Sequence, residues 1–258
     1  MRAQQGEGGV PETPNNLTPG GSARSLAMRL WRDYLSRFWT KLALALAAPV
    51  PALAQSGAIK PQATGLPAGD YKLDRAHASL VFKVDHLGMS RYTARFTGLD
   101  ATLTLDPADP AASRLVATVD ARARENHYPL KDIDFNALIQ GEKFLDAAKY
   151  PKITFRSTSI VLTAPNKARI TGDLTLHGVT RPVTMTATYN GGYASHPMDP
   201  GGSRIGFSAR GTLKRSDFGI TLGIPAPGTK MGVGDEVEFI LEVEFLRPAD
   251  KKDGPGKK

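Results

Sequence analysis

Residues 170–189 contain the sequence feature that most constrains the fold. Apolar residues or glycine occupy every second position of residues 170–177 and again of residues 183–189, and most positions between them are threonine. Because a strand points successive side chains to opposite faces, this alternation predicts two strands with one apolar and one polar face each. The short His177-Gly178 connection predicts a β-hairpin, with Pro182 at the first residue of its second strand because proline cannot donate a ladder hydrogen bond. The apolar face must then be covered by other elements or by a ligand.

The same alternation recurs along the chain, and we count about eight strands in all. The further stretches are residues 80–84, 92–96, 99–106, 115–121, 153–157, 205–213 and 237–245. Short turns between neighbouring strands favour an all-β fold, an eight-stranded antiparallel barrel, since closure removes the exposed edges of long strands. A β-sandwich remains an alternative.

Residues 122–151 break the strand pattern. Residues 131–140 and 142–149 are compatible with helix, Gly141 interrupts them, and Pro151 ends the second. We therefore expect a short helical insertion that closes one end of the strand structure.

The polar faces of the strands are charged. They include Asp100, Asp106, Glu238, Glu242 and Glu244. An outer-membrane barrel needs an apolar lipid-facing side, so this pattern excludes stable membrane insertion and turns the apolar faces inward.

The N-terminal region predicts export. Arg29, Arg32, Arg37 and Lys41 precede the apolar residues 42–48, and Ala52-Leu53-Ala54 follows as a small-x-small cleavage site. We expect translation to start at Met28, cleavage after Ala54 and a periplasmic location. The domain plan is then residues 1–54 as extension and signal peptide, 55–69 as linker, 70–247 as barrel and 248–258 as a charged, disordered tail.

Charge and composition narrow the function classes. Residues 1–54 hold six of the 33 Lys/Arg and three of the 25 Asp/Glu, and the positive residues of the remainder are scattered. This distribution offers no basic patch for nucleic acid. The chain has no cysteine, so it forms no disulfide and no thiolate metal site.

An eight-stranded barrel either fills with side chains or encloses one small ligand. Small residues recur on the inner faces, which favours a cavity, although alternating small and large residues also tile a packed barrel. The predicted tunnel lining is Phe82, Val84, Phe96, Leu103, Ala117, Val119, Phe155, Leu174, Met185, Ala187, Phe207, Ala209, Leu213, Phe239 and Leu241.

The order of several motifs resembles the YceI-like polyisoprenoid-binding family over residues 70–247. The motifs are Tyr71, Leu73, Asp74, His77, Ser79, Leu80, Phe82, Val84, His86-Leu87-Gly88 and Ser90; then Phe144-Leu145-Asp146, Tyr150-Pro151, Ile153, Phe155 and Ser157; then residues 172–183, residues 214–219, and Gly234-Asp235 with Val237. Residues 93–96 and 123–126 depart from the family pattern and affect only loop detail.

The resemblance implies a periplasmic, extended, lipocalin-like barrel, often a homodimer, that carries a polyisoprenoid such as a quinone or polyprenyl phosphate, or a fatty chain, in its lumen. The alternatives are a stress-response interaction protein with a filled barrel and a lipid-modifying enzyme. No G-x-S-x-G elbow or paired base is visible, so we predict no catalytic residues and no cofactor.

Two sets of polar residues are candidate sites. His77, His86 and His177 lack metal-ligand spacing, so we predict turn-capping hydrogen bonds and no metal site. Lys214, Arg215, Ser216, Asp217 and Phe218 form a candidate head-group rim, because a strand with an inward apolar face ends there in two cations, a hydroxyl and an aromatic ring. The alternative is that Arg215 pairs with Asp217 across a turn.

Overall fold

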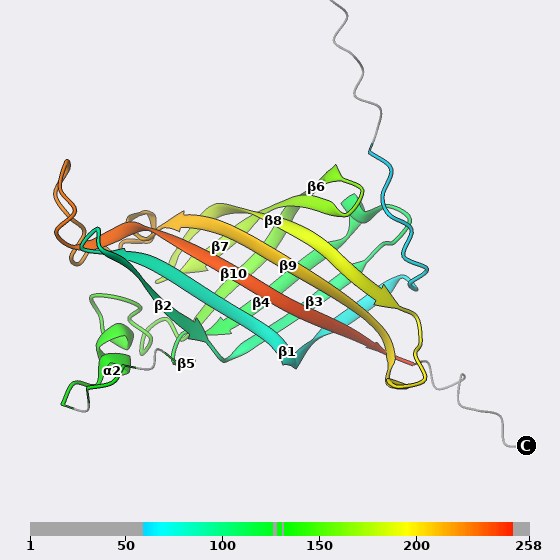
Figure 1. Cartoon of the computed structure of the whole chain (residues 1–258), viewed down its shortest axis with the longest axis horizontal. Helices are drawn as coiled ribbons and strands as arrows, with labels where there is room; N and C mark the ends of the chain where they lie inside the picture. The colour runs from blue at the N-terminus through cyan, green and yellow to red at the C-terminus, as the bar shows by residue number, and fades with distance from the viewer. Residues whose placement is uncertain (1–58, 126–127, 131, 250–258) are drawn as a thin grey trace, which may run out of the picture. The chain divides into compact units, whose positions relative to one another are not determined.

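The computed structural model describes residues 59–125, 128–130 and 132–249 (Figure 1). The predicted leader, with its start at Met28 and its cleavage site after Ala54, lies outside these residues, as does most of the predicted tail. Within the described ranges, no helix is both long and apolar enough to cross a bilayer.

In the part of the chain that the structure describes, ten antiparallel strands form one sheet, and eight of them close into a barrel. The strands are β1 (Gly69–His86), β2 (Ser90–Phe96), β3 (Leu99–Leu105), β4 (Arg114–Asp120), β5 (Arg124–Glu125), β6 (Lys152–Ala164), β7 (Lys167–Leu176), β8 (Val179–Tyr193), β9 (Gly202–Lys214) and β10 (Val233–Pro248). The order β10-β9-β8-β7-β6-β4-β3-β1 returns to its start because β1 also pairs with β10. The predicted eight-stranded antiparallel barrel is confirmed.

Strands β2 and β5 lie outside the ring of eight, and the length of β1 accounts for the position of β2. Its first residues pair with β3, where Lys72 lies opposite Thr102, and its last residues pair with β2, where Phe82 lies opposite Ala94. Strands β2 and β3 therefore follow one another along the same edge of β1. The two-residue strand β5 pairs with β2 alone and lies outside the ring of eight.

The predicted hairpin is present as β7 and β8. His177 and Gly178 have φ angles of 52° and 76°, as a tight two-residue turn requires. The position predicted for Pro182 was wrong, since β8 begins at Val179 and Pro182 lies opposite Asp173 within the strand. Proline is tolerated there because β9 pairs with β8 only from Met185 onward, which leaves the second edge of Pro182 open.

The insertion contains less helix than predicted. Helix α2 spans Phe135–Gln140, and the side chain of Asp134 caps it by accepting the N–H of Ala137. Residues 142–149 form successive turns instead of a second helix, because Asp146 adopts a positive φ of 42° and its N–H bonds back to Gly141. The 3-10 helices are η1 (Pro110–Ala112) and η2 (Arg215–Phe218).

The two ends of the barrel differ in what covers them (Figure 1). At the end where β1 and β9 finish, called here the α2 end, α2, η2 and the connection from η2 to β10 gather, and Phe218 and Ile220 pack with Leu176 and Val183. At the opposite end, the segment before β1 packs on the barrel: Leu66 is 5% exposed beside Tyr71 and Ile205. Residues 61–67, expected to be linker, are therefore partly built into the fold.

Candidate functional site

The barrel encloses an apolar cavity of about 900 Å³. All fifteen side chains predicted to line a tunnel contribute to its wall. They do so because the two-residue period of each strand fixes the face of every residue, and the closed ring turns all the apolar faces inward.

Two pairs of alanines line the cavity and leave space in it. Ala187 lies directly opposite Ala209, and Ala101 lies opposite Ala117, on neighbouring strands. The inner glycines contribute no such space. A Cβ atom at Gly172 would lie 2.4 Å from the ring of Phe155, since that ring already occupies the place of the missing side chain.

Aromatic rings form much of the wall. Phe82 and Phe96 have ring centroids 5.4 Å apart, and Phe207 lies 6.0 Å from Tyr189 and 6.3 Å from Phe245. Such offset and tilted pairs add stability beyond the area they bury. The wall therefore suits aliphatic chains and flat rings better than solvated polar groups.

A few polar groups interrupt this apolar wall, and sequence reasoning missed them. The hydroxyl of Tyr92 is buried without a hydrogen-bond partner in the described part of the chain, and burial raises the pKa of both Tyr92 and Tyr189. Arg124 on β5 is not part of this wall; it lies opposite Phe96 of β2 and donates to the carbonyl oxygens of Ala121 and Asn136. Tyr92 lies four positions before Phe96 on β2, so both side chains point to the same face. This spacing was the signal in the sequence that could have identified Tyr92.

Of the five residues predicted to form a head-group rim, Arg215 alone lines the cavity. Arg215 is 6% exposed, and its guanidinium donates to the carbonyl oxygens of Gly234, Leu222 and Val233 at 2.7 to 2.8 Å, and to that of Ile220 at 3.4 Å. Its partners are backbone carbonyls and not Asp217, so the alternative prediction of an Arg215–Asp217 pair was wrong. Arg215 fixes the connection between η2 and β10.

The other rim residues divide between core and surface. Phe218 is 1% exposed within the apolar cluster of the α2 end. The N–H and hydroxyl of Ser216 both donate to the carboxylate of Asp235. Lys214 and Asp217 are exposed beside a separate surface pocket. The five residues share a turn and no common site.

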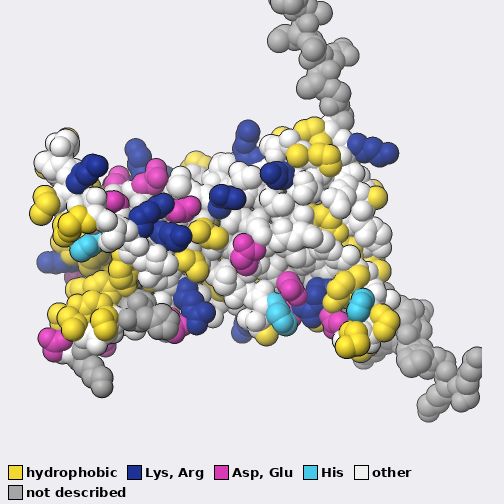
Figure 2. Space-filling view, viewed as in Figure 1, with side chains coloured by type: hydrophobic (Ala, Val, Ile, Leu, Met, Phe, Trp, Pro, Cys, Tyr) yellow, Lys and Arg dark blue, Asp and Glu magenta, His cyan; other side chains and the backbone are white. Residues whose placement is uncertain are grey.

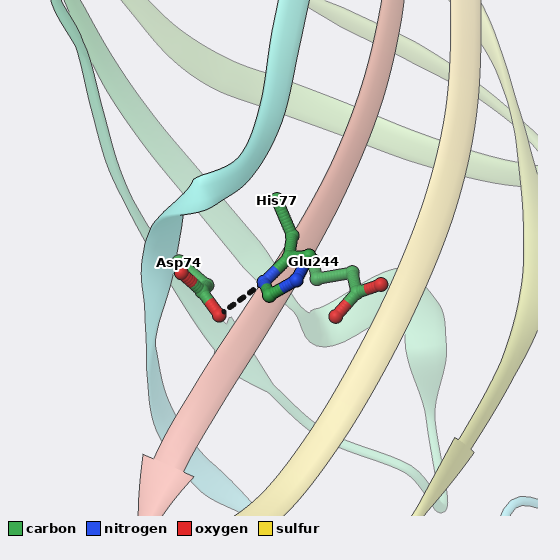
Figure 3. A group of neighbouring side chains, drawn as sticks. All are labelled: Asp74, His77 and Glu244. Atoms are coloured by element: carbon green, nitrogen blue, oxygen red, sulfur yellow. Dashed lines mark hydrogen bonds and ion pairs between the residues drawn. The ribbon is translucent and has the colours of Figure 1, made fainter.

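The predicted role of His177 is confirmed. Its Nδ1 lies 3.0 Å from the carbonyl oxygen of Phe218, so it joins the β7–β8 turn to η2. His77 instead bonds a side chain, because its Nδ1 lies 2.8 Å from the carboxylate of Asp74 (Figure 3).

Asp74, His77 and Glu244 come close enough together to resemble a metal site (Figure 3). Arg204 already supplies the positive charge there, because its guanidinium lies 2.6 Å from Asp74, 2.7 Å from Asp199 and 2.8 Å from Glu244. The group is an ion-pair network at the opposite end of the barrel.

A closed eight-stranded barrel around a large apolar cavity defines the class of β-barrels with an internal ligand cavity. The chain belongs to the YceI-like family: the model of the YceI-like domain matches residues 71–245. A UPF0312 protein of Vibrio cholerae is 38% identical over 183 residues, which cover 70% of this chain and 88% of that protein. A UPF0312 protein of Pseudomonas putida is 40% identical over 59% of this chain and 77% of its own length.

Solved structures share the fold. The crystal structure of BcnA from Burkholderia cenocepacia has a TM-score of 0.56 and 24% identity, and covers 67% of this chain and 98% of its own. A polyisoprenoid binding domain from Saccharophagus degradans has a TM-score of 0.50 and 15% identity, and covers 69% of this chain and 98% of its own.

Proposed function

We propose that this chain is a periplasmic lipid-binding protein that holds a polyisoprenoid, such as a quinone or polyprenyl phosphate, or a similar long-chain amphiphile in the barrel. The observation that carries the proposal is the apolar cavity of about 900 Å³, a size typical of small-molecule sites. Packed interiors leave few voids larger than a water molecule, so the cavity counts against the filled-barrel alternative.

The energetics favour a long apolar ligand. Burial of one five-carbon isoprene unit contributes ~4 kcal/mol at ~0.8 kcal/mol per carbon, before the cost of ordering the chain. A few units therefore suffice for micromolar binding or better. The chemistry proposed is binding without a catalytic step.

Two further observations support the proposal. The related fold from Saccharophagus degradans is described as a polyisoprenoid binding domain, although at 15% identity that likeness concerns the fold alone. The charged, apolar and small-x-small segments of residues 29–54 support export to the periplasm.

The test is to purify the protein from the periplasm, sequence its N-terminus and identify any bound lipid by native mass spectrometry and organic extraction. We expect a chain that begins at Gln55 and carries a long-chain lipid. Ala187→Phe is the matched variant, because Ala187 lines the cavity opposite Ala209 and a phenyl ring there fills the space of the ligand.

For Ala187→Phe we expect loss of the lipid with a fall in unfolding free energy below the ~1 to 3 kcal/mol typical of an overpacked core. A parent protein without lipid, together with a variant that is strongly destabilised, would favour a packed interior and defeat the proposal.

A further inference from the structure

Large exposed hydrophobic side chains gather at the α2 end of the barrel. Among the described residues, six of the ten large hydrophobic side chains that are exposed lie there, in three segments far apart in the sequence. In Figure 2 hydrophobic side chains stand out on this end, at the left of the view. The six are Met89 and Met231 (76% exposed each), Leu130 (54%), Leu138 (48%), Ile133 (46%) and Leu222 (43%).

The three segments are neighbours in space. The N–H of Leu87 donates to the carbonyl of Gly232 at 2.8 Å, which ties the β1–β2 turn to the loop that carries Met231. The N–H of Val233 donates to the carbonyl of Gly223 at 2.7 Å, beside Leu222. The ring of Tyr92 on β2 lies 5.6 Å from that of Phe135 on α2. The six side chains, which all lie on these neighbouring segments, are called here the apolar fringe.

The apolar fringe is continuous with the cavity. Leu138 lines the cavity and is also 48% exposed. His86 and Ser90, at the two sides of the β1–β2 turn, likewise line the cavity and are exposed. At this end of the barrel, the apolar wall of the cavity therefore reaches the apolar outer surface.

The charges around the fringe nearly balance. The described residues of 85–91, 128–143 and 219–233 include three Lys/Arg and four Asp/Glu. A surface of this kind gains little from an anionic partner, and its attraction is that of apolar side chains at loop tips.

We propose that the apolar fringe docks on the surface of a phospholipid bilayer, with Met89 and Met231 inserted at the boundary between head groups and acyl chains. Exposed apolar side chains above a nearly balanced polar surface suit that boundary. A stable protein interface uses about 20 to 30 residues a side, more than this fringe of six protruding side chains offers. The purpose of docking, passage of lipid between bilayer and cavity, rests on the proposed function.

The test is flotation of the purified protein with vesicles of phosphatidylcholine and phosphatidylethanolamine. The variant is Met89→Ser with Met231→Ser, because neither side chain lines the cavity. The matched control is Met198→Ser, since Met198 is 87% exposed in the β8–β9 connection at the opposite end. We expect the wild type and the control to float, and the double variant to partition at least about tenfold less.

Salt sharpens the test, because binding that depends on apolar burial should change little between low and high ionic strength. Three results would overturn the proposal: a wild type that does not float, a double variant that floats as well as the control, or binding that salt abolishes. If the wild type does not float with vesicles and the double mutation dissociates a homodimer, the fringe is a dimer interface instead. The proposed function is tested separately by the lipid extracted from each variant. The double variant should still carry bound lipid, since its substitutions do not change the cavity.

Discussion

Two arginines at opposite ends of the barrel each hold neighbouring segments together, but they bind different kinds of acceptor. Arg215, at the α2 end, is 6% exposed and donates to four backbone carbonyl oxygens. Arg204, at the opposite end, has a side chain that is 17% exposed and pairs with three carboxylates. One guanidinium organises a loop through neutral acceptors, and the other joins strands through ion pairs.

The contacts of the two arginines should respond differently to pH. Burial lowers the pKa of Arg215, against an opposing effect of Asp235, and its carbonyl partners do not titrate. Hydrogen bonding to Asp74, above all, raises the pKa of Arg204, and the same contact lowers the pKa of Asp74 to about 2. The contacts of Arg215 should therefore persist in acid, whereas the ion pairs of Arg204 should weaken.

The largest expected effect is that of Arg215→Gln. The substitution leaves one buried and three partly buried carbonyl oxygens without this donor, and each buried unsatisfied group costs about 1 to 3 kcal/mol. We expect the free energy of unfolding, measured by denaturant titration, to fall by ~3 to 5 kcal/mol. Lys214→Gln is the control, since Lys214 is exposed, and should stay within about 0.5 kcal/mol.

The same variant decides between the two roles considered for Arg215. A scaffold role predicts that any loss of binding is equal for a lipid with a polar head group and for a headless hydrocarbon of equal length. Selective loss of the head-bearing lipid at unchanged stability would restore Arg215 as a head-group residue.

A smaller effect is expected at Asp74. Because its folded pKa is lowered, its stabilising contribution is fully present above the ordinary value of 3.8 and disappears as the pH falls through about 2. Asp74→Asn should therefore be less stable than the wild type by up to about 2 kcal/mol at pH 6, with the gap closing between about pH 4 and pH 2. A pH-independent gap in urea titrations would show that Asp74 acts through packing alone.

The smallest effect is expected at His77, whose side chain is 59% exposed. Asp74 raises the pKa of His77, so its contribution is present below the ordinary value of 6.5 and is lost as the pH rises through the raised value. Stability curves of the wild type and His77→Gln should converge toward pH 9 and separate slightly at pH 5. Divergence in the alkaline direction would contradict the ion pair.

Most of the barrel follows from local alternation. Residues such as Met185 and Ala187 could be assigned to the cavity wall because strand periodicity alone fixes the face of each side chain. The amount of space was harder to derive. Gly172 and Gly211 suggest extra volume in the sequence, yet the rings of Phe155 and Phe239 on neighbouring strands occupy it.

The roles of the arginines were beyond local reasoning. Arg215 donates hydrogen bonds to carbonyls of residues up to 19 positions away in the sequence. Arg204 donates one to Asp74, which is 130 positions away. Neither partner set has a periodic signature, because the partners of Arg215 are backbone carbonyls, which every residue has, and the carboxylates around Arg204 come from three separate segments. The prediction of helix over residues 131–149 was too long, since no glycine in the sequence marks the positive φ that Asp146 adopts.

The pairing of β1 with β10 has a kinetic consequence. The first and last strands meet from Lys72 opposite Leu246 to His86 opposite Val233, so the contacts that close the barrel join the most distant parts of the described chain. Such non-local contacts raise the relative contact order, and chains with high contact order fold in milliseconds to seconds. Until β10 arrives, β1 and β9 each present an unpaired edge along the open seam, and during that interval the chain is most prone to pair with other strands.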